Sequence, residues 1–363
     1  MTITSEKPTV RIENQAFELV TDLLVGMEMT EQEMGFSSLM LRLNNFASTS
    51  SGAGFAFEDN SILKLGAKIQ VGGGDENQPG EIFQGTISCL EAEFPSRDSA
   101  HLVVLAEDAL QKARMTRRTK VHPDDATVQD LARLVADELG LQFVPNEFEQ
   151  SIGARVQLNE SNLAFLRRML ARFDGDVQIV GEELHVSPRA NVQRGDPVIM
   201  EFQTESEDAD ILSLKCAHVS ADLAQQTTEV TVSGWDPEQG QRVTGRSTGA
   251  NLRGDASQGS TGAQLLEHVN IRRAEHVGHL AITSETEATA IADAAFDCRA
   301  RKFVCLDGTA QGDPRIRVGA TVDVRGLGPR FDNKYYVTTA CHRWDRRRGY
   351  EVDFEAECAY WGA

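Results

Sequence analysis

The chain has 363 residues, of which 40% are hydrophobic and 25% are charged. This composition is typical of a soluble globular protein, and the length predicts about two to four domains. The formal net charge is -19. Binding to phosphate backbones requires clustered Lys and Arg, so this charge excludes direct nucleic-acid binding through the overall field.

The sequence carries no signal for a membrane or for secretion. Residues 1–8 lack the basic start and the apolar core of a signal peptide. No run of about eighteen apolar residues is present, so neither a transmembrane helix nor membrane insertion is expected. We therefore expect the protein to be made and assembled in the cytoplasm.

The chain contains six cysteines, and no two of them have the C-x-x-C spacing. In a cytoplasmic chain they are expected to be reduced and mostly buried. A metal or disulfide pair between Cys298 and Cys305 is the alternative. The six are Cys89, Cys216, Cys298, Cys305, Cys341 and Cys358.

The first part of the chain, residues 9–112, is predicted to be all-β. Short runs of β-prone residues alternate with turn residues, which is typical of antiparallel strands. A glycine-rich loop at 71–80 lacks the Gly-Lys-Ser/Thr that opens a helix in a phosphate-binding loop, so it predicts a hairpin. The expected strands cover 9–12, 36–43, 68–71, 81–87 and 101–105.

Residues 113–190 are predicted to form a small α+β unit. Thr127 and Asp130 favour a helix start, and Gly140 favours its end. A second helix is expected from about Ser161 to Phe173, before a hairpin at 177–186. The apolar stripe on each helix indicates core packing rather than a ligand site.

Strands return at 198–202, 211–216 and 228–235. Residues 237–263 are rich in Gly, Ser, Thr and Gln, and predict a long loop that is disordered or becomes ordered on assembly. A capping box at 284–287 predicts a third helix that runs to about Phe303.

The last part of the chain, from Gly308 to Phe354, reads as short strands separated by Gly and Pro. Apolar and polar residues alternate, which predicts antiparallel strands with one buried face. The strands are expected at 316–324, 335–338 and 350–354. No catalytic constellation accompanies them.

Two sets of histidines are candidates for chemical sites. His276 and His279 would share a face on a helix, as metal ligands can, but Gly278 lies between them and no H-E-x-x-H pattern is present. His342, beside Trp344, has no nucleophile or orienting acid near it in sequence. A packed or hydrogen-bonded strand histidine is the favoured interpretation.

Clustered charges have simpler interpretations. The basic cluster is expected at a solvated hairpin tip or a subunit salt-bridge patch, and the acidic run on a solvated face or an acidic channel wall. The acid pairs are expected at element ends, where Asp124 and Asp125 suit a helix N-terminus. We assign no catalytic, cofactor-binding or metal-binding residue. The clusters are Arg343 with Arg346, Arg347 and Arg348; Glu205, Glu207, Asp208 and Asp210; Asp124 with Asp125; and Glu182 with Glu183.

Motifs in a fixed order resemble one protein family. They are Phe83–Ile87, Asp130–Ala136 with Gly140 and Leu141, Ser161–Ala171 with Leu184–Pro188, Ser233–Pro237, Ser284–Ala295, and Gly326–Gly328 followed by Phe331, Tyr335–Val337 and His342. The chain resembles the phage late control D proteins, the baseplate hubs of contractile tails. It is similar to the N-terminal hub part of type VI secretion VgrG spikes. One departure is Asn162, where an acidic residue is common.

The resemblance implies a mainly β fold with α+β insertions. Two similar antiparallel β-barrels per chain would form a pseudo-sixfold ring as a homotrimer. Closed barrels leave few free sheet edges. The implied domains are a first barrel at 1–112, an α+β insertion at 113–190, a second barrel at 191–240 with 305–363, and an inserted loop and helix domain at 241–304.

The implied function is structural. Such a hub joins a sixfold inner tube to a trimeric spike, and also meets baseplate wedge proteins. We expect a separate spike polypeptide, because the sequence ends after the last expected barrel strand. We expect incorporation into a phage tail-like or extracellular injection particle, with no enzymatic activity and no cofactor.

Two other functions remain as alternatives. A tail-associated cell-wall hydrolase or metal-dependent enzyme would need a nucleophile paired with a base, or facing carboxylates, and the sequence displays neither. A polymerising tube subunit would need a single barrel, whereas the length of this chain suggests two.

Overall fold

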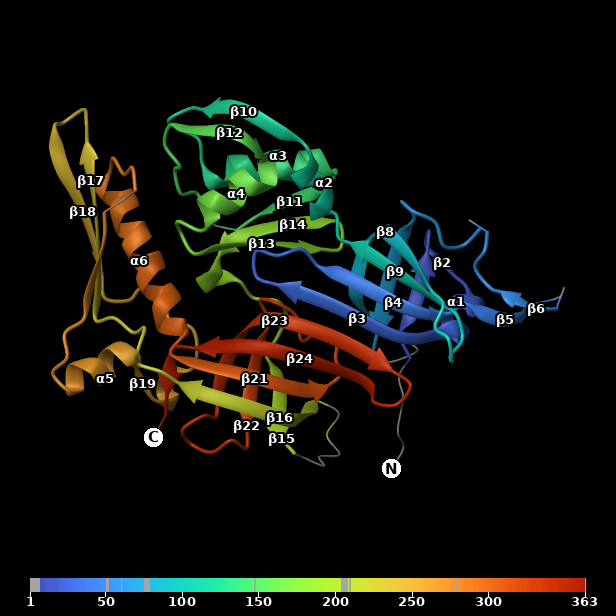
Figure 1. The fold of residues 1–363 in the computed structure, drawn as a ribbon. Helices are drawn as coiled ribbons and strands as arrows, with labels where there is room; N and C mark the ends of the chain where they lie inside the picture. Colours follow the sequence, from blue (N-terminus) through green and yellow to red (C-terminus); the bar gives the residue numbers. More distant parts are fainter. Residues whose placement is uncertain are drawn as a thin grey trace. The chain divides into compact units, whose positions relative to one another are not determined.

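A computed structural model describes residues 7–49, 52–59, 61–74, 79–146, 148–203, 208, 210–278 and 280–362. The chain is mainly β, and six α-helices and two short 3-10 helices accompany the strands of the described residues (Figure 1). Contacts divide the chain into two compact units. The first contains the residues up to Gln111 with Thr309–Val318 and Thr339–Phe354, and the second contains Lys112–Gly308, Gly319–Thr338 and Glu355–Ala363.

The first unit is built on one antiparallel sheet with the strand order β2-β1-β7-β8-β9-β4-β3-β23. Inward positions alternate along its strands, so Met29, Leu41 and Val104 are buried in its core. The N-terminal elements are β1 (Thr9–Ile12), β2 (Gln15–Ala16), α1 (Glu18–Leu23), β3 (Leu24–Gln32), β4 (Ser38–Asn44), β5 (Phe46–Thr49), β6 (Gly52–Phe55), β7 (Lys68–Gly73), β8 (Gly80–Glu93), β9 (His101–Glu107) and α2 (Leu110–Met115).

The second unit begins with the predicted α+β segment. The predicted cap residues of the first helix are confirmed. The Thr127 side chain accepts a hydrogen bond from the Asp130 amide, and Gly140 ends the helix with a φ of 70°. The second helix is capped by Ser161. The elements are β10 (Arg117–His122), α3 (Val128–Leu139), β11 (Gln142–Pro145), β12 (Arg155–Ser161), α4 (Asn162–Leu170), β13 (Gly175–Val180), β14 (Glu183–Pro188) and η1 (Arg189–Asn191).

A six-stranded barrel follows. Its strand order is β23-β22-β15-β16-β21-β24, and a further pairing of β23 with β24 closes the ring. Strand β15 is parallel to both of its neighbours, β16 and β22. The strands are β15 (Val198–Phe202), β16 (Ile211–Ala221), β21 (Val304–Gln311), β22 (Thr321–Arg325), β23 (Asn333–Asp345) and β24 (Gly349–Cys358).

In the sequence, the segment between β16 and β21 forms a small sheet that packs against a long helix. Strands β18, β17 and β20 form a three-stranded sheet in that order, and Ser284 caps helix α6. The elements are β17 (Glu229–Asp236), β18 (Gln241–Ser247), η2 (Ala256–Gln258), β19 (Ser260–Thr261), α5 (Gly262–His268), β20 (Ala274–Val277) and α6 (Glu285–Arg301), and β25 (Tyr360–Trp361) pairs with β19.

Two predictions about local structure were wrong. Residues 237–263 are not one long loop, because β18 pairs with β17 over its whole length and α5 follows. Gly245 of this segment lies directly against Ala288 of α6, a close contact that composition alone does not reveal. The strand predicted at 316–324 begins only at Thr321, because a turn from Asp313 to Ile316 precedes it.

The mainly β class is therefore established, with one closed barrel. The presence of a second, similar barrel and the predicted domain bounds remain predictions. None of the helices in the described ranges is long and apolar enough to cross a membrane.

Candidate functional site

The two histidine candidates are ordinary parts of the sheets. His276 lies on strand β20, where its ring contacts the hydroxyls of Thr231 and Ser233 at 3.0 Å each, and His279 lies outside the described residues. The backbone at His276 is extended rather than helical, so a spacing of three residues does not place two side chains on the same face there. Within the described part of the chain, no group of three His, Cys, Asp or Glu side chains could hold a metal ion.

His342 is fully buried in the first unit and hydrogen-bonded at both ring nitrogens. Its Nε2 lies 2.9 Å from the carbonyl oxygen of Ile316, and its Nδ1 lies 2.7 Å from the hydroxyl of Tyr350. A carbonyl only accepts, so Nε2 carries a proton. The interpretation as a hydrogen-bonded strand histidine is confirmed.

The described residues at the tip of the predicted basic cluster are exposed to solvent. Arg346, Arg347 and Arg348 form the turn between β23 and β24, and Asp345 accepts hydrogen bonds from the amides of Arg347 and Arg348. Three of the four predicted basic residues are thus at a hairpin tip, whereas Arg343 lies on β23 and pairs with Asp353 of β24. Of the acidic run, Glu205 and Glu207 lie outside the described residues.

The acid pairs lie at turns, and the cysteines are unpaired. Asp124 and Asp125 lie in an exposed turn before α3, whose first-turn acid is Asp130, while Glu182 and Glu183 lie at the β13–β14 turn. All six cysteines are free, including Cys298 and Cys305. Only Cys358 is buried, so the prediction that most are buried was wrong.

The second unit instead contains a charged cavity that sequence reasoning missed. It has a volume of about 290 Å³ and lies where η1, the segment after β18 and helix α6 converge. Both aromatic and charged side chains line it. The charged lining residues are Asp174, Arg189, Arg253, Asp293, Asp297 and Arg301.

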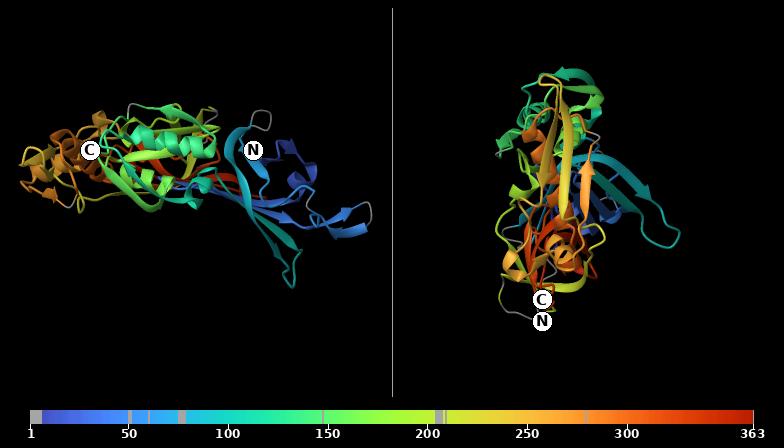
Figure 2. Two further views of the ribbon diagram at one scale, coloured as in Figure 1. Left: turned by 90° about the horizontal axis from the view of Figure 1, so that it is seen from above. Right: turned by 90° about the vertical axis from the view of Figure 1, so that its left-hand side faces the viewer.

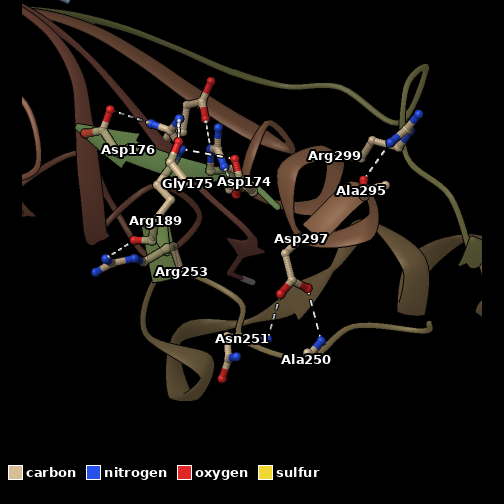
Figure 3. Close-up of polar contacts among 12 residues, drawn as sticks. Asp174, Gly175, Asp176, Arg189, Ala250, Asn251, Arg253, Ala295, Asp297 and Arg299 are labelled. Atoms are coloured by element: carbon tan, nitrogen blue, oxygen red, sulfur yellow. Dashed lines mark hydrogen bonds and ion pairs between the residues drawn. The ribbon is translucent and has the colours of Figure 1, made fainter. Parts of the chain in front are cut away.

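Asp174 is the centre of this cavity's ion pairs (Figure 3). It lies between α4 and β13, and its φ of 46° is in the left-handed region of backbone conformation. Its Oδ1 accepts a hydrogen bond from Arg189 Nε at 3.1 Å, and its Oδ2 accepts one from Arg301. Arg301 Nε also donates to Glu357 on β24 at 2.8 Å. One carboxylate thus ties the α+β segment to α6, and through Arg301 to the barrel.

Arg253 approaches the same cluster without a carboxylate contact of its own. Its Nη2 donates to the carbonyl oxygens of Arg189 and Val192, and its guanidinium lies 4.9 Å from the ring centroid of Tyr336. Burial, together with Arg301 and Arg189, holds the pKa of Arg253 below its ordinary value, although Tyr336 opposes this. Arg253 therefore fixes backbone carbonyls rather than balancing an acid.

Asp297 closes the cavity from helix α6. Its two carboxylate oxygens accept hydrogen bonds from the backbone amides of Ala250 and Asn251, at 3.0 Å and 2.8 Å. Burial raises the pKa of Asp297, and the negative charges of Asp293 and Asp174 raise it further. The role of this carboxylate is to hold the segment after β18 against α6.

A second ion cluster holds the first turn of α6. Glu287 Oε1 accepts hydrogen bonds from Arg172 Nη2 at 2.5 Å and from Arg155 Nη2 at 3.2 Å. Arg155 also donates to the carbonyl oxygen of Ala281 at 2.7 Å. Helix α6 is therefore bound to the α+β segment near both of its ends.

Chemically, both clusters are suited to holding elements together. The carboxylates of Asp174, Asp297 and Glu287 are bound by guanidinium or amide donors. Among the described residues that line the cavity there is no Ser, Cys or Lys that could act as a nucleophile. The residues were missed because Asp174, Arg189, Arg253, Arg301 and Glu357 are spread over 184 positions of the sequence. Asp174 before Gly175 was the one local signal, because this pair favours a left-handed turn.

A family model described as the Alg8 N-terminal domain matches residues 42–345. The chain belongs to this family. The match does not confirm the late control D assignment, which remains a prediction. No curated protein sequence matches the chain significantly.

Solved structures share the fold of this Alg8 N-terminal domain family member. The 43 kDa tail protein of prophage MuSo2 from Shewanella oneidensis has a TM-score of 0.66 at 12% identity, covering 97% of this chain and 98% of that chain. The tail protein from Neisseria meningitidis MC58 has a TM-score of 0.66 at 13% identity, covering 97% and 96%. A type VI secretion system component from E. coli has a TM-score of 0.58 at 12% identity, covering 96% and 76%.

At this level of identity the likeness establishes the fold, which this chain has in common with phage tail and type VI secretion proteins. The match extends over almost the whole chain, so it includes both compact units and the α+β segment.

Proposed function

We propose that this chain is the structural baseplate hub of a contractile injection system or phage-like tail. The observation that carries the proposal is the end-to-end likeness to two tail proteins, which leaves almost no part of either chain unmatched. The type VI secretion component with the same fold supports it, because that protein is itself described as structurally similar to T4 bacteriophage tail proteins.

The hub acts as a homotrimer that joins a sixfold inner tube to a trimeric spike. The physical basis is symmetry matching: three chains with two related barrels each present six similar units to the tube and three identical sites to the spike. The proposed domains are a barrel at 1–112, an α+β insertion at 113–190, a second barrel at 191–240 with 305–363, and an insertion at 241–304.

The proposed role is non-enzymatic. Inner tube subunits, the spike and baseplate wedge proteins are the partners, and the chain assembles in the cytoplasm before it is incorporated into the particle. The charged clusters described above support a role in which rigidity matters, because they fix α6 to its neighbours at both ends.

Native mass spectrometry of the purified chain tests this function. We expect a closed species of three chains, each of 39.8 kDa. Hexamers, open-ended filaments or a monomer at all concentrations would contradict the hub. A cell-wall hydrolysis assay with added metal ions is the companion test, and turnover that survives further purification would show an enzyme instead.

A further inference from the structure

The three-stranded sheet of β18, β17 and β20 has one buried face and one open face. Val230, Val232 and Val243 point inward and are fully or almost fully buried. On the same side, Gly245 lies directly against Ala288 of α6. Figure 2 (right) shows these strands in front of α6, so the opposite face of the sheet points away from the helix.

The open face combines an exposed tryptophan with exposed arginines. Trp235 pairs across the strands with Arg242, and Thr231 pairs with Arg246. Trp235 is 59% exposed. Arg246 and the neighbouring Arg272 both bind the carboxylate of Glu229 on this side of the sheet. Exposed Trp and Arg side chains together are the residues most enriched at binding hot spots.

A hollow lies beside the start of β17, at the far end of this face from Trp235. Its volume is about 470 Å³, and its lining includes Arg246, Arg272, Glu229 and Ile271. Both guanidiniums donate to the same oxygen, Glu229 Oε2, at 3.0 Å and 2.9 Å. Glu229 is buried, and the hydrogen bond from Arg272 lowers its pKa, so it is an anion that orients the two arginines.

Each arginine retains donors beyond the one that Glu229 uses. A guanidinium has five N–H donors in a fixed fork, which matches the geometry of a carboxylate. Ile271 lies beside them with half of its surface exposed, and it offers an apolar contact next to the charge. Glu267 also lines the hollow and, with Glu229, disfavours a polyanion such as nucleic acid, whose charges would meet both carboxylates.

We propose that this open face is a docking surface for an extended segment of a partner protein, in which one carboxylate side chain is followed by an apolar residue. The carboxylate binds Arg246 and Arg272, and the segment runs along β17 to Trp235. Trp235 lies six positions after Glu229 along the strand, a span of about 20 Å. The inference does not depend on the hub assignment, because it uses only the chemistry of this sheet.

Fluorescence anisotropy with a labelled peptide, Glu-Leu-Ser-Val-Thr-Leu, tests the proposal on the full chain. We expect saturable binding that weakens between about 50 mM and about 500 mM salt, because the contact is charged. The same peptide with Gln in place of Glu should bind about tenfold more weakly. Equal binding of both peptides, or no saturable binding, would overturn the proposal.

The double variant Arg246→Gln, Arg272→Gln should weaken binding about tenfold or more, and Trp235→Ala should weaken it several-fold. Arg325→Gln is the matched control, because Arg325 is also half-exposed and bound to one carboxylate, Asp323. Circular dichroism checks that the variants are folded.

Three results would refute the docking surface. The control variant could lose as much binding as the double variant. A single-stranded oligonucleotide could bind more tightly than the peptide, which would indicate a polyanion site. The double variant could change the oligomeric state by native mass spectrometry, which would show that the face is occupied by a second copy of this chain.

Discussion

At the scale of single residues, the most consequential contact of the first unit is the buried pair of Glu31 and Arg317. Arg317 Nε and Nη2 donate to the two oxygens of Glu31 at 2.6 Å and 3.1 Å, a bidentate geometry. Both residues are buried. Burial alone would lower the pKa of Arg317, but Glu31 outweighs it and holds the pKa above its ordinary value.

Glu31→Gln leaves the buried guanidinium without its counter-charge, so we expect it to lower the free energy of unfolding by about 3–5 kcal/mol. Replacing both partners by leucine should recover most of this loss, because no buried charge then remains. Urea denaturation measures both effects. Glu93→Gln is the control: it breaks the half-exposed pair with Arg42 and should cost less than about 1 kcal/mol.

Cysteine reactivity is a second prediction at this scale. Burial, reinforced by Glu357 and Asp307, raises the pKa of Cys305 to about 11. Only the thiolate reacts, so the reactive fraction of Cys305 at pH 8 should be about a hundredfold smaller than that of an ordinary thiol. Peptide mapping after iodoacetamide treatment should show the exposed Cys216 modified first. Modification of Cys305 should increase only toward pH 11, and equal rates at pH 8 would contradict this.

At the scale of elements, the helix ends were predictable and the tight packing was not. Thr127, Ser161 and Ser284 each cap a helix that the sequence predicts, because a cap is a contact within four residues of the chain. Strand β18 was missed because its fit depends on α6. A Cβ at Gly245 would lie 2.2 Å from the Ala288 carbonyl carbon. The glycine that suggested a loop is a site of close backbone approach.

Gly245→Ala should therefore separate β18 from α6. The added methyl group meets backbone atoms, which cannot rotate away, and we expect a loss of about 1–3 kcal/mol of unfolding free energy. Thermal unfolding followed by circular dichroism measures the change. Thr244→Ala, on the exposed face of the same strand, should leave stability almost unchanged. Similar losses from both variants would indicate a general effect on strand propensity instead.

The charged contact at the start of α6 predicts a local effect. Arg172 is largely buried beside Glu287, and burial lowers the pKa of Arg172 although Glu287 opposes this. Glu287→Gln removes the counter-charge of a buried guanidinium and should cost about 3 kcal/mol. Hydrogen exchange should become faster in α4 and in the first turn of α6. Glu285→Gln, an exposed acid in the same turn, is the control and should leave the exchange rates unchanged.

At the scale of the whole molecule, the class of fold followed from the sequence but the sheet order did not. Alternating runs predict strands, yet β3 pairs with β23 through contacts such as Gln32 with Thr339, which lie about three hundred positions apart in the chain. Pairing over that distance is decided by tertiary packing, for which a single sequence offers no local signal. The same holds for the cavity, whose arginines and aspartates come from separate elements.

The net charge of -19 leads to a last prediction about assembly. Three copies in a closed ring repel one another, so the proposed trimer must depend on apolar burial that outweighs this repulsion. Salt screens repulsion between exposed charges that lie farther apart than the Debye length, which is about 10 Å at 0.1 M and shortens as salt is added. The trimer fraction should therefore increase between about 50 mM and about 500 mM salt. Sedimentation velocity at constant protein concentration measures that fraction. A trimer that dissociates as salt increases would instead show an interface made of complementary charges. Because the proposed docking of an acidic segment weakens with salt, the opposite trends separate self-association from partner binding on the same sample.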